Sequence, residues 1–134
     1  MTKLFYFSIF FFCFFNGWAS DFHRVITWAT TAEKTTDQAK SSPSFEGCIR
    51  VDNTGLPYWF ESFELSSSNA EVLVSNTVFE SAENMYIDSN AISNAELKYT
   101  SEIVSSAGKT FLKLRIFPFI SQNHRIEKLV GFTV

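Results

Sequence analysis

The chain has 134 residues, a formal charge of −3 and 16 phenylalanines. Its mildly acidic balance and the lack of any Lys/Arg cluster in its sequence argue against nucleic acid and anionic membrane surfaces as partners, because both attract basic patches. Of its two cysteines, one lies in the N-terminal apolar segment described next. A disulfide inside the folded domain is therefore not expected.

The first element in chain order is an N-terminal export signal. A lysine precedes the apolar run LFYFSIFFFCFF at residues 4–15, and the small residues Gly17 and Ala19 fit the pattern before a signal-peptidase cut. We therefore expect residues 1–19 to be a signal peptide and residues 20–134 to form one domain. A membrane anchor needs about 18–20 apolar residues, so we expect no membrane span after signal cleavage.

The first predicted strand covers residues 22–28. Its large apolar side chains alternate onto one face: Phe22, Ile26 and Trp28. Arg24 interrupts that face. Residues 30–44 then contain no large apolar side chain, so burial there cannot offset the entropy lost on ordering, and we expect a mobile crossover.

Two further strands follow, at residues 45–51 (FEGCIRV) and 56–65 (LPYWFESFEL). In the first, alternation sends Phe45 and Ile49 to one side and Cys48 to the other. The intervening DNTG has the residue types of a tight turn. In the second strand, Pro57 marks the beginning or an edge, because proline donates no backbone hydrogen bond.

The segment AEVLVSNTVFE at residues 70–80 is β-branched and apolar on both faces, which predicts a central strand. Residues 81–96 fit neither the helical nor the strand period, and we expect a long loop with about one helical turn. Three more strands are predicted at 97–104, 109–119 and 126–134. The fold class predicted from this pattern is an all-β, antiparallel β-sandwich of about seven strands, with a flattened barrel as the alternative.

The last predicted strand ends the chain without a polar tail. Its apolar side chains are expected to share one face that needs a neighbouring sheet: Ile126, Val130, Phe132 and Val134. Termini usually end in a few loosely held polar residues. We therefore expect the chain to have been followed by more polypeptide.

Three side chains are candidates for nucleophilic catalysis, namely Cys48, His23 and His124. A thiol needs a neighbouring base to become a thiolate, but these residues are expected on a strand face, at a strand start and at a hairpin tip. The same isolation leaves no ligand spacing for a metal ion. We therefore predict no catalytic, cofactor-binding or metal-binding residue.

Two other patterns on residues 56–65 are candidates for carbohydrate chemistry. Glu61 and Glu64, three residues apart on one strand, face opposite ways and cannot flank a glycosidic bond. The aromatic run contains Tyr58, Trp59, Phe60 and Phe63. Alternation cannot place all of these rings on one face, so core packing with one exposed ring is favoured over a glycan-stacking platform.

Several segments, taken in order, resemble a known family. VITW at 25–28 ends a strand in tryptophan, FEGC at 45–48 carries an F-x-G strand, and LPYWFESFEL is a Leu-Pro-aromatic segment. AEVLVSNTVFE comes next. The last segment, LRIFPFISQNHRIEKLVGFTV at 114–134, ends with the motif Glu-Lys-Leu-Val-x-Phe at residues 127–132. These segments are similar to the N-terminal region of PorU-type sortases of the type IX secretion system in Bacteroidetes, which are gingipain-like cysteine peptidases.

The resemblance covers about residues 22–134, with Gly131 standing where the family has serine. It implies a non-catalytic domain that precedes further β-structure and a peptidase domain, with the catalytic Cys and His downstream. The parent enzyme would remove C-terminal sorting domains from secreted cargo.

The implied location is exported: periplasm, outer membrane or cell surface of a Gram-negative bacterium. The implied partners are downstream domains of the same parent chain and type IX secretion components. The alternative is a free-standing cell-surface binding or adhesion module that uses Trp59 and its neighbours.

Overall fold

The computed structural model describes residues 21–29, 43–50, 56–83, 85, 87 and 89–134. The predicted signal peptide at 1–19 and the predicted turn at 52–55 lie outside the described residues, as does nearly all of the predicted crossover at 30–44.

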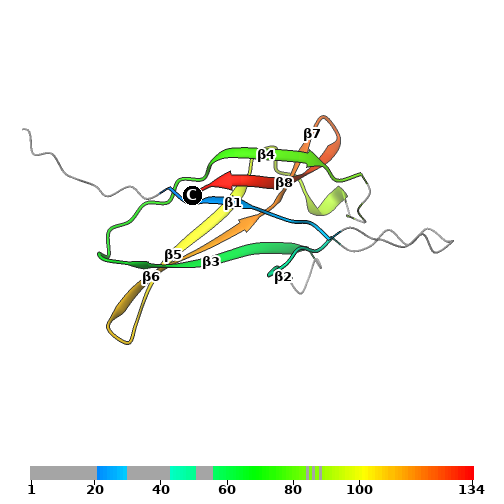
Figure 1. Ribbon diagram of the computed structural model, residues 1–134. Coiled ribbons are helices and arrows are strands. Elements are labelled where there is room, and N and C mark those ends of the chain that lie inside the picture. Colours follow the sequence, from blue (N-terminus) through cyan, green and yellow to red (C-terminus); the bar gives the residue numbers. More distant parts are fainter. Residues whose placement is uncertain (1–20, 30–42, 51–55, 84, 86, 88) are drawn as a thin grey trace, which may run out of the picture.

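The described residues form an all-β fold, as predicted, with eight strands and one 3-10 turn (Figure 1). The strands are β1 (His23–Val25), β2 (Ile49–Arg50), β3 (Pro57–Leu65), β4 (Ser75–Ser81), β5 (Lys98–Ser106), β6 (Lys109–Phe117), β7 (Phe119–Gln122) and β8 (Arg125–Thr133). The 3-10 turn is η1 (Ser89–Ala91). It lies in the segment 81–96, where a loop with one helical turn was expected.

The strands form two antiparallel sheets, which confirms the sandwich class. In the first sheet, β8 lies between β4 on one side and β1 and β7 on the other. The second sheet has the order β2-β3-β6-β5. Figure 1 shows these sheets as two layers, with the β5–β6 hairpin projecting beyond the rest of the molecule. β8 is the inner strand of the first sheet, and β3 and β6 are the inner strands of the second.

The core lies between the sheets, and its Leu, Ile and Phe side chains with 0% exposure come from β6 and β8. Alternation along β6 sends Leu112, Leu114 and Ile116 inward, with exposed fractions of 4%, 0% and 0%. From the other sheet, Leu129 and Phe132 of β8 are both 0% exposed. No polar or charged residue is fully buried among the described residues, so apolar packing closes the sandwich.

The predicted single strand at 109–119 is wrong in one respect, because it divides at Pro118 into β6 and β7. Proline has no N–H for a sheet ladder, and here β6 pairs with β3 and β5 whereas β7 pairs with β8. The carbonyl of Pro118 accepts a hydrogen bond from the Leu129 N–H at 2.7 Å. Pro118 is therefore the point at which the chain passes from one sheet to the other.

The predicted continuous strand at 45–51 is also wrong. Gly47 has φ of +78°, and the Cys48 N–H donates to the Phe45 carbonyl at 3.2 Å, which closes a tight turn. Phe45 instead forms an isolated bridge with Trp28. The alternating pattern concealed the turn because glycine at Gly47 permits a left-handed backbone that alternation does not reveal.

The prediction of a central strand at 70–80 is wrong. Strand β4 begins only at Ser75 and is an edge strand, paired with β8 alone. Its register with β8 shifts between Ser75 and Val78, where Asn76 has φ of +50°. The apolar residues before it, such as Val72 and Val74, pack against the core without joining a sheet.

A second register shift explains why Leu129, which the one-face prediction for residues 126–134 left out, also enters the core. Val78 pairs with Gly131 but the next residue, Phe79, pairs with Leu129. One step on β4 thus matches two on β8, so Leu129 and Phe132 both enter the core although they are three apart. Strict alternation assigned Leu129 to the opposite face from Phe132.

A matched pair of leucine truncations tests this assignment of the core. Leu114→Ala should lower the free energy of unfolding by about 2–5 kcal/mol, since it removes a side chain that is 0% exposed and leaves a cavity. Leu73→Ala removes the same atoms from a side chain that is 71% exposed and should change it by less than about 0.5 kcal/mol. Equal losses in urea denaturation would contradict this core.

Candidate functional site

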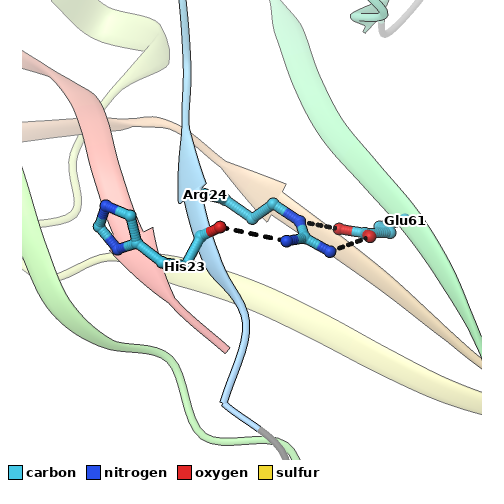
Figure 2. Close-up of polar contacts among 3 residues, drawn as sticks. All are labelled: His23, Arg24 and Glu61. Atoms are coloured by element: carbon cyan, nitrogen blue, oxygen red, sulfur yellow. Dashed lines mark hydrogen bonds and ion pairs between the residues drawn. The ribbon is translucent and has the colours of Figure 1, made fainter.

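One strongly bonded pair of charges joins the two sheets. Arg24 of β1 donates from Nε to Glu61 Oε2 at 2.9 Å and from Nη2 to Oε1 at 2.6 Å (Figure 2). Its remaining terminal nitrogen, Nη1, donates to the His23 carbonyl at 3.1 Å. This is the paired geometry in which a planar guanidinium binds a carboxylate most strongly.

The sheet register explains why both charges point between the layers. Arg24 pairs with Phe132, and Glu61 of β3 pairs with Leu114. Directly paired residues share a face, and both of these neighbours are 0% exposed. Each charge therefore occupies an inward-facing strand position at which an apolar residue is expected. The two positions lie opposite each other, one in each sheet.

The ion pair is half-buried, with side-chain exposures of 33% for Arg24 and 26% for Glu61. Hydrogen bonding to Glu61 raises the pKa of Arg24, burial opposes that rise, and the Coulombic attraction adds to it. A raised pKa means that the stabilisation is complete below the ordinary arginine value and is lost only at more alkaline pH. Arg24 therefore keeps its charge throughout the neutral range.

Aromatic rings extend this contact along the interface. The Arg24 guanidinium lies 5.3 Å from the centre of the Phe22 ring, and that ring lies 5.3 Å from Phe63 of β3. Cation and rings together connect β1 with β3, strands that belong to different sheets. Since the acceptors and donors of this cluster satisfy one another, it acts as a structural clamp and offers no free acid or base.

The three candidates for nucleophilic chemistry lie apart. Cys48 is a half-buried free thiol that follows the turn at Gly47 and packs against the core. His23 is exposed on β1 opposite Thr133, and His124 is exposed in the β7–β8 turn, where φ is +62°. Within the described part of the chain, no hydrogen bond or ion pair links the thiol to either imidazole, and no cluster of three potential metal ligands occurs.

The carboxylates of β3 have separate partners. Glu64 pairs with Lys109 at 3.5 Å, and both side chains are more than half exposed. Glu61 belongs to the interior pair with Arg24. The two carboxylates thus stabilise different contacts on different faces, and the sequence revealed the partner of neither.

The aromatic run of β3 divides between the two faces. Trp59 packs edge-on against Phe132 of the core, with 4.9 Å between ring centres. Tyr58 instead lies 6.0 Å from Phe117, and Phe60, two residues on, shares its face. The run therefore builds core on one side and leaves two half-buried rings on the other.

Cations are interleaved with the outward rings. The Arg115 guanidinium lies 5.8 Å from the Tyr58 ring centre, and the Lys98 ammonium lies 5.5 Å from that of Phe117. Arg115 is paired in register with Phe60. A basic and aromatic surface of this kind was not visible in the sequence, because its members come from three different strands.

A hollow in the surface is lined by Ser68, Asn69, Ala70 and Glu71. These are consecutive residues, so the hollow is the inside of one bend and not a cleft between elements. It brings no distant side chains together and has no catalytic constellation.

Comparison with protein-family models, curated proteins and solved structures found no match. None of the described residues forms a helix long and apolar enough to cross a membrane.

A double-mutant cycle tests the clamp. Arg24→Met and Glu61→Leu should each lower the free energy of unfolding by about 1–2 kcal/mol, since each leaves one half-buried charge unpaired. The double variant should return to within about 1 kcal/mol of the original, because an apolar pair suits the position.

The exposed pair provides the matched control. Lys109→Met and Glu64→Leu should each change stability by less than about 0.5 kcal/mol, because water screens both groups. Urea denaturation of all the variants measures these differences. If the losses at Arg24 and Glu61 simply add in the double variant, the two residues are not coupled.

Proposed function

We propose that this chain is a non-catalytic accessory domain of an exported, type IX sortase-like cysteine peptidase. The observation that carries the proposal is where the family-like segments lie. LPYWFESFEL contains β3, and LRIFPFISQNHRIEKLVGFTV contains the last four residues of β6 and all of β7 and β8. Much of the resemblance therefore falls on β3, β6 and β8, the inner strands of the two sheets. The other family-like segments lie on or beside the edge strands β1 and β4 and at the turn around Gly47.

The fold gives a physical reason for the motif that ends the family-like region. In Glu-Lys-Leu-Val-x-Phe, Leu129 and Phe132 supply fully buried core side chains. The preceding Pro-aromatic pair, Pro118 and Phe119, sits where the chain changes sheets, and both residues are buried. A segment with these constraints tolerates few substitutions, which supports treating the resemblance as more than a coincidence of apolar residues.

In this proposal the domain works by presenting a stable surface, and the chemistry belongs to another part of the parent chain. The half-buried Cys48 packs against the core and has no imidazole partner among the described residues. Arg24 and Glu61 are committed to each other. The sandwich would pack on a downstream domain of the parent or on secretion components, in the periplasm, outer membrane or at the cell surface.

A cargo-processing assay tests this function. In a type IX-competent bacterium that encodes the chain, deleting residues 21–134 from the gene should leave secreted cargo with its C-terminal sorting domain attached. Cys48→Ala should process cargo normally, since the thiol is not the nucleophile. Mass spectrometry of surface cargo measures the outcome.

The gene sequence provides an independent test of the proposal. The proposal requires further coding sequence downstream of Val134, with another β-domain and a peptidase domain containing His and Cys. A gene without such sequence, or normal cargo processing after the deletion, overturns the proposal. Loss of processing in Cys48→Ala, with the fold retained by circular dichroism, would instead assign chemistry to this domain.

A second candidate, a surface-binding module, is favoured by one observation. The outer face of β3 and β6 presents Tyr58 and Phe60 beside Arg115, and aromatic–cation surfaces suit acidic glycans or proteins. Trp59 is not part of this surface because it packs on Phe132.

Binding measurements separate the two candidates. If the chain is a binding module, Phe60→Ala should abolish binding to an array of acidic glycans, whereas Thr77→Ala on the exposed part of β4 should leave it unchanged. An array on which the original chain binds nothing would remove this candidate for glycans.

A further inference from the structure

The edges of the two sheets are protected to different degrees. β1 has three residues and β2 has two, and β4 is interrupted by register shifts. Beyond its pairing with β2, β3 is approached by β1 through the Arg24–Glu61 and Phe22–Phe63 contacts. Short strands, bulges and covering elements are the usual means of preventing edge-to-edge pairing.

Strand β5 has none of these protections. Its nine residues, Lys98–Ser106, pair with β6 in one unbroken register, and no other described strand pairs with its outer side. It contains no proline or glycine, and its hairpin end projects beyond the rest of the molecule (Figure 1). β5 is therefore a long, regular and open edge.

The hairpin determines which backbone groups this edge presents. Ser106 pairs with Lys109 across a two-residue loop, Ala107 and Gly108, whose φ angles are +51° and +77°. These are the angles of a type I′ turn, in which the residues flanking the loop exchange both backbone hydrogen bonds. Since such pairs alternate with non-hydrogen-bonded ones, the even-numbered residues bond to β6, and those at 99, 101, 103 and 105 direct their N–H and C=O outward.

The side chains of the edge are complementary to themselves. Lys98 and Glu102 lie on the same face, four residues apart and symmetric about Thr100. Ile103, on the other face, is 41% exposed although it is paired with the buried Leu112. The strand thus carries one cation, one anion and one partly uncovered apolar residue in positions that a reversed copy of itself can satisfy.

We propose that two copies of this chain pair through β5, antiparallel, about a twofold axis at Thr100. Lys98 then lies opposite Glu102 of the second copy, and this pair occurs twice. Tyr99 lies opposite Ser101, and Leu97 lies opposite Ile103, so the exposed isoleucine is covered. The two β2-β3-β6-β5 sheets become one continuous sheet across the dimer.

Charge selects this register over its neighbours. Because the outward N–H and C=O groups belong to odd-numbered residues, odd-numbered residues of one copy must lie opposite odd-numbered residues of the other. The second copy can therefore shift along β5 only by two residues at a time, which moves the twofold axis by one residue. An axis at Glu102 would oppose two carboxylates, and an axis at Ser101 would place Lys98 opposite Val104. With the axis at Thr100, each Glu102 lies between Lys113 of its own chain, its partner in register, and Lys98 of the other copy.

The dimer requires only β5, and it holds whether or not the chain serves a sortase-like peptidase. The test is the oligomeric state of the full chain as purified from an exporting host, measured by sedimentation equilibrium. The expected result is a discrete dimer. Lys98→Glu and Glu102→Lys should each raise the Kd of the dimer by at least about tenfold, since each variant places two pairs of like charges opposite each other.

The charge-reversed double variant, Lys98→Glu with Glu102→Lys, should restore the Kd to within about threefold, because both cross-copy pairs are re-formed with opposite polarity. Glu71→Lys, which changes the net charge as Glu102→Lys does but at an exposed residue outside the sheets, should leave the Kd unchanged. A monomeric original chain at about 1 mM, or a double variant no tighter than the single variants, overturns the proposal.

Cross-linking tests the register separately. In a Cys48→Ala background, Thr100→Cys should form an intermolecular disulfide on mild oxidation, because opposed residues of a non-hydrogen-bonded pair lie at about the Cα separation that a disulfide spans. Ser101→Cys should cross-link less efficiently, since its closest counterpart is Tyr99. Preferential cross-linking at Ser101 would contradict the axis at Thr100.

Discussion

The fold depends on the abrupt crossing of the chain between the two sheets at Pro118. Before it, β6 is an inner strand of one sheet; after it, β7 and β8 belong to the other. Because proline cannot donate to a ladder, the strand that began in one layer cannot simply continue in it. The residues on either side of this break, Ile116 and Phe119, are both buried, so the crossing is fixed within the core.

Sequence alternation predicted most of the fold, because most strands have one solvated and one buried face. β3, β5, β6 and β8 each lie close to their expected positions, and the sandwich class followed from their spacing. Alternation failed where the backbone departs from the regular pleat. Gly47 turns the chain inside a seemingly regular pattern, and the shift at Val78 and Phe79 brings Leu129 inward. Such departures depend on backbone angles and on the partner strand, which one-strand patterns do not contain.

The Arg24–Glu61 pair shows a different limit of prediction from sequence, which concerns contacts between distant strands. Each residue was visible as a charge in a β-strand, and Arg24 was recognised as interrupting an apolar face. Their pairing depends on the placement of β1 over β3, which no local pattern specifies. A useful signal is nevertheless present: opposite charges at inward positions of two strands from different sheets are expected to meet, because neither can remain buried alone.

The interior charges Arg24 and Glu61 bind each other, and the described residues also present surfaces that suit a partner. Two are prominent: the aromatic and cationic outer face around Tyr58, and the open edge of β5. These surfaces are adjacent, because Lys98 belongs to both. A partner bound at the edge would therefore alter the charge of the face, and a variant at Lys98 affects both surfaces, whereas one at Phe60 or Thr100 separates them.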